Sequence, residues 1–263
     1  MGMLQDIWNY RGFILGSVKR EFQLKYRNSL LGAAWTVLNP LAMILVYTVV
    51  FSEVMKTRLP GMDSAYAYSI YLCSGMLTWN LFAEIISRSQ TVFLDHANLL
   101  KKVSFPKICL PIIIVLGAFL NFLIIFGLFT GFLIISGNFP GAVYLALIPL
   151  LIIEILFSIS LGIIVGVLNV FFRDIGQFMG VALQFWFWLT PIVYLRSILS
   201  EPGQALMSLN PLANLMGAFQ GILVYGDLPY WPSIIPLLMI TLGLCFLALK
   251  LFRLRSGEMV EEI

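Results

Sequence analysis

The chain has 263 residues, of which 60% are hydrophobic and 11% are charged, and its mean hydropathy is +0.95. So little polar surface cannot cover a soluble globule, so the composition excludes a soluble protein and predicts an integral membrane protein. The net charge of +3 gives no indication of nucleic-acid binding.

Residues 1–28 are predicted to form an amphipathic helix on the cytoplasmic surface of the membrane. At 100° per residue, one arc of about 120° collects most of the apolar side chains. Such a stripe favours a helix that lies in the interface rather than across it. The stripe consists of Leu4, Ile7, Trp8, Ile14, Leu15, Val18 and Phe22.

Six apolar runs follow within residues 29–254, and each is close to the roughly twenty residues that cross the hydrocarbon core as a helix. The uncharged stretch 108–153 is about twice that length, and the turn sequence 137–141 divides it in two. The fold prediction is therefore an all-α integral membrane domain with six transmembrane helices, at about 30–52, 65–86, 108–136, 142–170, 176–195 and 230–251.

Residues 196–229, between the last two spans, include an uncharged run that is long enough to cross the membrane. Its Pro, Gly, Asn and Gln residues interrupt the backbone, and a crossing there would place Lys250, Arg253 and Arg255 outside. We predict a pair of short re-entrant helices in the outer leaflet instead. Residues 255–263 are predicted as a cytoplasmic tail.

The positive charges set the orientation. With six spans, all of the sixteen Lys and Arg residues except Lys56, Arg58 and Arg196 fall on one side. Cytoplasmic loops retain Lys and Arg, so both termini are predicted to be inside.

Few residues suit catalysis or metal binding. The single His, His96, has no His or Cys partner nearby, and the three cysteines show no ligand spacing. The dipeptide Gly-Lys does not occur, so there is no P-loop. No metal site, no cofactor of its own and no enzymatic activity are predicted for this chain.

Two acids lie within or beside the apolar runs. Glu84 precedes Arg88 by four residues, which predicts an ion pair on one helix face. Glu154 lies near mid-membrane, where an acid is treated as a functional hypothesis. It fits an ion-coupled transporter, and a hydrogen-bonded Glu between helices fits equally.

Aromatic residues are also conspicuous. Trp and Tyr favour headgroup depth, which accounts for most of them. The cluster at 185–188 lies deeper than such a belt requires, and aromatic faces can stack on sugar rings. The candidates for a glycan path are Trp35, Trp79, Phe185, Trp186, Trp188 and Tyr194.

Local sequences recur along nearly the whole chain in the order of one family. They include the stretch 26–32, Asn39-Pro40, the stretch 75–80, the stretch 98–107, the stretch 168–174, the stretch 190–194 and Leu209-Asn210-Pro211. As a set they resemble the Wzm/TagG-like ABC-2 type permeases, which export polysaccharides such as O-antigen, capsule and teichoic acid. Thr78 departs from the family pattern, which often has Pro before the Trp.

The resemblance implies a homodimer that works in the inner membrane with two copies of a separate ATPase subunit, which binds ATP and Mg. It implies a coupling loop at 87–107, and residues 196–229 as an outer gate. The residues implied to contact the ATPase are Asp95, His96, Asn98, Leu99, Leu100, Lys101 and Lys102.

The resemblance also implies a substrate, a polysaccharide on undecaprenyl diphosphate. Arg27, Arg88 and Lys101 are candidates for binding the diphosphate by charge-assisted hydrogen bonds, although contacts to the ATPase would suit them equally. O-antigen is the favoured glycan, and teichoic acid or capsular polysaccharide remains open. The alternatives from other classes are an ion-coupled transporter that uses Glu154 and a membrane enzyme of lipid-linked sugar metabolism.

Overall fold

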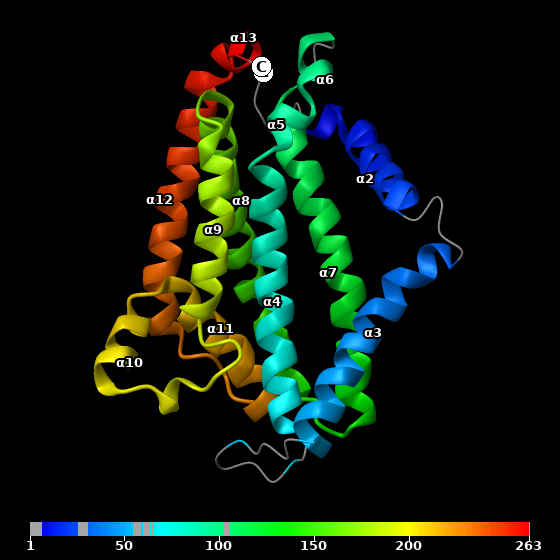
Figure 1. Cartoon of the computed structure of the whole chain (residues 1–263), viewed down its shortest axis with the longest axis vertical. Helices are drawn as coiled ribbons and strands as arrows, with labels where there is room; N and C mark the ends of the chain where they lie inside the picture. The colour runs from blue at the N-terminus through cyan, green and yellow to red at the C-terminus, as the bar shows by residue number, and fades with distance from the viewer. Residues whose placement is uncertain are drawn as a thin grey trace.

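The computed structural model describes residues 7–25, 31–54, 59, 64, 66–102 and 106–262. Every regular element in these ranges is a helix. Figure 1 shows α4, α7, α8, α9 and α12 running along the long axis of the molecule as one bundle. The all-α prediction is confirmed for the described residues.

Among the residues that the structure describes, four helices are long and apolar enough to cross a membrane. They are α4 (Ala67–Ser89), α7 (Cys109–Ile135), the continuous pair η3 (Gly141–Ala146) and α8 (Leu147–Phe171), and α12 (Trp231–Arg255). Their lengths of 23, 27, 31 and 25 residues exceed the roughly twenty that are required. An integral membrane protein with several crossings follows.

The other two expected spans contain shorter helices. α3 (Trp35–Thr48) follows the short η1 (Gly32–Ala34) and continues into a π-helical turn, η2 (Val49–Val54). α9 (Asp174–Trp188) ends well before the predicted residue 195, because Pro191 has no N–H to donate and disfavours helical backbone at Thr190. The four long helices support several crossings, and the six-span count stays a prediction for the shorter α3 and α9.

The centre of the bundle is α4, of which 78% of the most apolar stretch is buried, against 22% for α12. α4 packs on α7, α8 and α11, and α8 packs on α12. Glycines bring α4 and α8 together: a Cβ on Gly166 would lie 2.4 Å from the Ser89 carbonyl oxygen, and one on Gly162 would lie 2.7 Å from the Ser89 Cβ. Small residues at such crossings are typical of membrane helices, where backbones pack closely.

The two ends of the bundle differ (Figure 1). At one end lie α2 (Arg11–Lys25), α5 (Val92–Asp95), α6 (Ala97–Lys102) and α13 (Glu258–Glu262). Toward the other end lie η4 (Arg196–Ile198), α10 (Glu201–Ser208), α11 (Pro211–Gln220) and the π-helical η5 (Gly221–Tyr225). The segment expected to form two short helices does form two, with the break at Leu209 and Asn210.

α2 packs against α7 through part of its predicted apolar stripe. Ile14 and Val18 are buried, whereas Trp8 and Leu15 are 69% and 62% exposed. The stripe is therefore divided between the bundle and the outside, and the position of α2 at a membrane surface stays a prediction. Leu4 lies outside the described residues.

Candidate functional site

The end of the bundle that carries α2 contains the candidate site. A pocket of about 530 Å³ lies between α2, the end of α4, α5 and α7, and we call it the α2 pocket. Its polar lining brings Arg20 and Glu21 of α2 next to Arg88, Asp95 and His96. Residues from the expected surface helix and from the expected coupling loop thus meet in one place.

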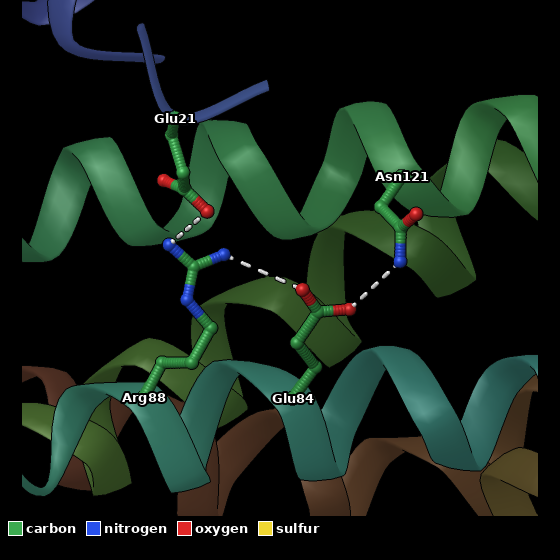
Figure 2. Close-up of polar contacts among 4 residues, drawn as sticks. All are labelled: Glu21, Glu84, Arg88 and Asn121. Carbon is green, nitrogen blue, oxygen red and sulfur yellow. Dashed lines mark hydrogen bonds and ion pairs between the residues drawn. The ribbon is translucent and has the colours of Figure 1, made fainter. Parts of the chain in front are cut away.

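A network of four side chains centred on Arg88 joins three helices at this pocket, as Figure 2 shows. The Nη2 atom of Arg88 lies 2.7 Å from Oε1 of Glu21 on α2, and its Nη1 lies 3.3 Å from Oε1 of Glu84. The second oxygen of Glu84 accepts a hydrogen bond from Nδ2 of Asn121 on α7 at 3.1 Å. The predicted Glu84–Arg88 pair is confirmed, and it belongs to a larger network that we call the α2 link.

A glycine on α7 leaves space for this network. A Cβ at Gly117 would lie 3.2 Å from Nη1 of Arg88 and 3.3 Å from Oε2 of Glu21. Because α7 has no side chain here, the guanidinium can reach across it to α2. Sequence reasoning missed Glu21, Gly117 and Asn121, since their pairing depends on how three separate helices pack.

The α2 link changes the role expected of Arg88. Its guanidinium already faces the carboxylates of Glu21 and Glu84, which compete with a diphosphate for Arg88, so diphosphate binding here stays a prediction. An anion could bind Arg88 only after Glu21 moved away. Arg27 lies outside the described residues, and Lys101 is exposed on α6.

The predicted coupling residues form a polar surface over an apolar anchor. Asp95, His96, Asn98 and Lys101 are exposed, and the carbonyl of Val92 lies 2.9 Å from Nδ1 of His96. Leu99 is half-buried in the α2 pocket, and the side chain of Lys102 lies outside the described set.

The anchor is a second apolar cluster, in which Leu100 packs with Phe93, Phe252 and Met259. Lys107 Nζ donates a hydrogen bond to the Ser256 carbonyl, and burial lowers the pKa of this lysine. The α5–α6 segment is thereby fixed both to α8 and to the end of α12. A force applied at its outer surface would reach the long helices.

The aromatic candidates fall into two groups. Trp35 on α3 and Phe185 and Trp188 on α9 are 45%, 66% and 59% exposed. Trp79 is buried, with its ring 5.2 Å from that of Phe82. The first three face outward from the bundle, whereas Trp79 faces its core.

Trp186 and Tyr194 have local hydrogen-bond partners. The indole of Trp186 donates to Oδ1 of Asn210 at 2.9 Å, and the hydroxyl of Tyr194 donates to the Trp188 carbonyl at 2.7 Å. Asn210 also caps α11 at Leu212 N and donates to the Leu189 carbonyl, at 3.1 and 2.9 Å. The end of α9 is therefore fastened to α11, and the Asn-Pro pair at 210–211 is the cap sequence that could have predicted it.

Glu154 lies on α8 with no exposed surface. Neither carboxylate oxygen has a hydrogen-bond partner among the residues that the structure describes. Its backbone oxygen accepts a hydrogen bond from Oγ of Ser158 at 2.6 Å. Within the same ranges, no three His, Cys, Asp or Glu side chains are grouped as a metal site would require.

Comparison with known proteins gives one consistent answer. Residues 14–224 match the family model for the ABC-2 type transporter. The chain is 31% identical to the O-antigen export system permease protein RfbA of Myxococcus xanthus over 264 residues, which cover 99% of both chains. It is 30% identical to a Klebsiella pneumoniae protein of the same name over 212 residues, 80% of each. The chain belongs to the ABC-2 type transporter family.

Proposed function

We propose that this chain is the permease subunit of an ATP-driven exporter that moves a lipid-linked polysaccharide of the O-antigen type across the inner membrane. The end-to-end match to a permease named for O-antigen export carries the proposal. Family membership supports a role as the membrane permease subunit, and the ATPase is proposed to be a separate subunit. Capsular polysaccharide and teichoic acid are the alternatives within the same family.

The proposed assembly is a homodimer of six-span subunits with two ATPase copies, and ATP and Mg bind to the ATPase. α3 and α9 are the two short spans, and both carry exposed aromatic side chains. Pairing these faces in a dimer would line a path with Trp35, Phe185 and Trp188. Trp79 and Trp186 would support that path from behind.

The ATPase is proposed to dock on the exposed residues of α5 and α6. Its motion would reach α4 directly through the chain and α12 through Leu100 and Lys107. The α2 link would carry the same motion to the surface helix. The diphosphate head is proposed to bind Arg27 and Lys101, with Arg88 available only when Glu21 leaves it.

Export in cells tests the proposal. Deletion of the gene should abolish the host's surface polysaccharide and leave its lipid-linked form inside the inner membrane, and a plasmid copy should restore export. A partner ATPase whose Walker lysine is replaced by Ala should give the same accumulation. Normal surface polysaccharide in the deletion strain would overturn the proposal.

A further inference from the structure

A second pocket, of about 410 Å³, lies toward the end of the bundle opposite α2, α5, α6 and α13, and we call it the α11 pocket (Figure 1). Its lining comes from α4, the loop after α9, α11, η5 and the start of α12. The volume is within the range of small-molecule sites, roughly 300–1,000 Å³. None of its lining residues belongs to the α2 pocket, the coupling surface or the aromatic path.

The floor of the α11 pocket is built from buried polar groups. Tyr71 is 6% exposed, and its hydroxyl donates to the carbonyls of Pro191 and Tyr194, at 3.1 and 3.0 Å. Gln220 is 3% exposed, and its Nε2 donates to the same Pro191 carbonyl at 3.3 Å. A Cβ at Gly75 would lie 2.8 Å from that Nε2, so a larger residue there would displace the Gln220 amide. These contacts fix the floor in one arrangement.

The rim carries one cation and one anion. Gly226, with φ of +69°, ends η5 and turns the chain so that Asp227 and Tyr230 reach the pocket. Arg196 approaches from the loop after α9, where its Nη2 donates to the Gln204 carbonyl at 3.2 Å. Within the described part of the chain, neither Arg196 nor Asp227 forms an ion pair.

This lining matches a neutral ligand rich in hydroxyl groups. A sugar hydroxyl both donates and accepts, so it can donate to a carboxylate and accept from a guanidinium at the same site. The rings of Tyr225 and Tyr230 are exposed for packing against the apolar face of a sugar. The charges of Arg196 and Asp227 cancel, so the pocket offers no net attraction to a diphosphate.

We propose that the α11 pocket binds a neutral sugar unit of the exported glycan on the side where the glycan leaves. The identity of the glycan rests on the proposed function above. The binding residues are separate from the aromatic path, and they lie beside the helices α10 and α11 that are expected to form the outer gate. Arg196, an outer charge without another assigned role, is thereby a glycan-binding residue.

Saturation-transfer NMR on the exporter in nanodiscs, with its ATPase present, tests the pocket. The probe is the repeat-unit oligosaccharide released by mild acid from the host's surface polysaccharide. Asp227→Asn and Arg196→Gln should each weaken binding about tenfold, as loss of one charged hydrogen bond predicts. Glu201→Gln is the matched control, because Glu201 is an exposed acid on α10 outside the pocket lining, and it should bind like the wild type.

Three results would overturn the proposal that the α11 pocket binds a neutral sugar. They are no binding by the wild type, equal binding by the wild type and both variants, or competition by inorganic pyrophosphate. Melting curves identify a variant that has lost its fold. The binding measured for the other variant then decides whether the α11 pocket binds the sugar. The export assay in cells is independent of this measurement. If the wild type exports the glycan but does not bind the oligosaccharide, the proposed function stands and sugar binding in the α11 pocket is ruled out.

Discussion

Glu154 combines full burial on α8 with two carboxylate oxygens that have no partner among the described residues. In an ion-coupled transporter such an acid would bind and release a cation or proton. That role needs neighbouring polar groups and access to water. The chain around Glu154 offers Phe157 and Ser158, one apolar and the other bonded to the backbone. Glu154 therefore fits packing inside an exporter driven by ATP.

Replacement of Glu154 by Gln is expected to leave export within about twofold of the wild-type rate, a change below about 0.4 kcal/mol. The amide has the same shape and cannot exchange a proton. Glu154→Lys is the contrasting variant, and a permanent charge at this depth should cost about 2.5–3.5 kcal/mol and lower the yield of folded protein. Surface polysaccharide and fluorescence-detected size-exclusion chromatography measure the two effects. Loss of export in a well-folded Glu154→Gln protein would favour ion coupling.

The α2 link offers a second test at the residue scale. Glu21→Gln and Glu84→Gln each remove one carboxylate from Arg88, but only the first removes the ion pair to α2. Gln at 84 can still accept from Asn121 through its amide oxygen. Both acids are partly exposed, so each change should cost only about 0.2–1 kcal/mol of stability.

We expect Glu21→Gln to lower the export obtained per ATP hydrolysed, and Glu84→Gln to leave this ratio near that of the wild type. The reason is that Glu21 forms the ion pair between α2 and Arg88 of α4, whereas Glu84 lies on α4 itself. ATP hydrolysis and glycan transport are measured together in proteoliposomes. Equal ratios for the two variants would contradict a mechanical role for the link.

At the scale of elements, hydropathy and charge predicted the long helices because lipid imposes length and composition on them. Periodicity also predicted the Glu84–Arg88 pair, which depends on one helix alone. The inward positions of Trp79 and Trp186 were beyond the sequence, since an aromatic residue suits the core, the lipid or a glycan path equally. The early end of α9 could have been predicted from Pro191 and the residue before it.

The crossing of α4 and α8 gives a prediction with a matched control. Gly166→Ala places a Cβ against a backbone oxygen that cannot move aside, so the helices must separate. We expect a loss of about 1–3 kcal/mol, as for other overpacked sites. Gly127→Ala on α7 has nothing within 4 Å of the new Cβ, and it should be neutral or stabilising by up to about 1 kcal/mol. Melting temperatures in detergent compare them, and equal values would show that the crossing tolerates separation.

At the scale of the whole molecule, the orientation of the chain in the membrane depends on whether the two short helices, α3 and α9, cross it. α9 has 15 residues, about 23 Å as a helix, against a hydrocarbon core of roughly 30 Å. It can cross only if the bilayer thins or if the flanking turn completes the passage. The positive charges at the α6 and α13 end favour that end as cytoplasmic.

Single cysteines decide the topology in a background without Cys73, Cys109 and Cys245. Phe139 lies in the turn between α7 and η3, Ser197 lies between α9 and α10, and Gly257 lies between α12 and α13; all three are exposed. With six spans, a membrane-impermeant maleimide should label Phe139→Cys and Ser197→Cys in intact cells, and Gly257→Cys only after permeabilisation. If α9 did not cross, the maleimide would label Phe139→Cys in intact cells but would label Ser197→Cys only after permeabilisation. If α11 crossed, Ser197→Cys and Gly257→Cys would share a side, so each alternative leaves its own pattern.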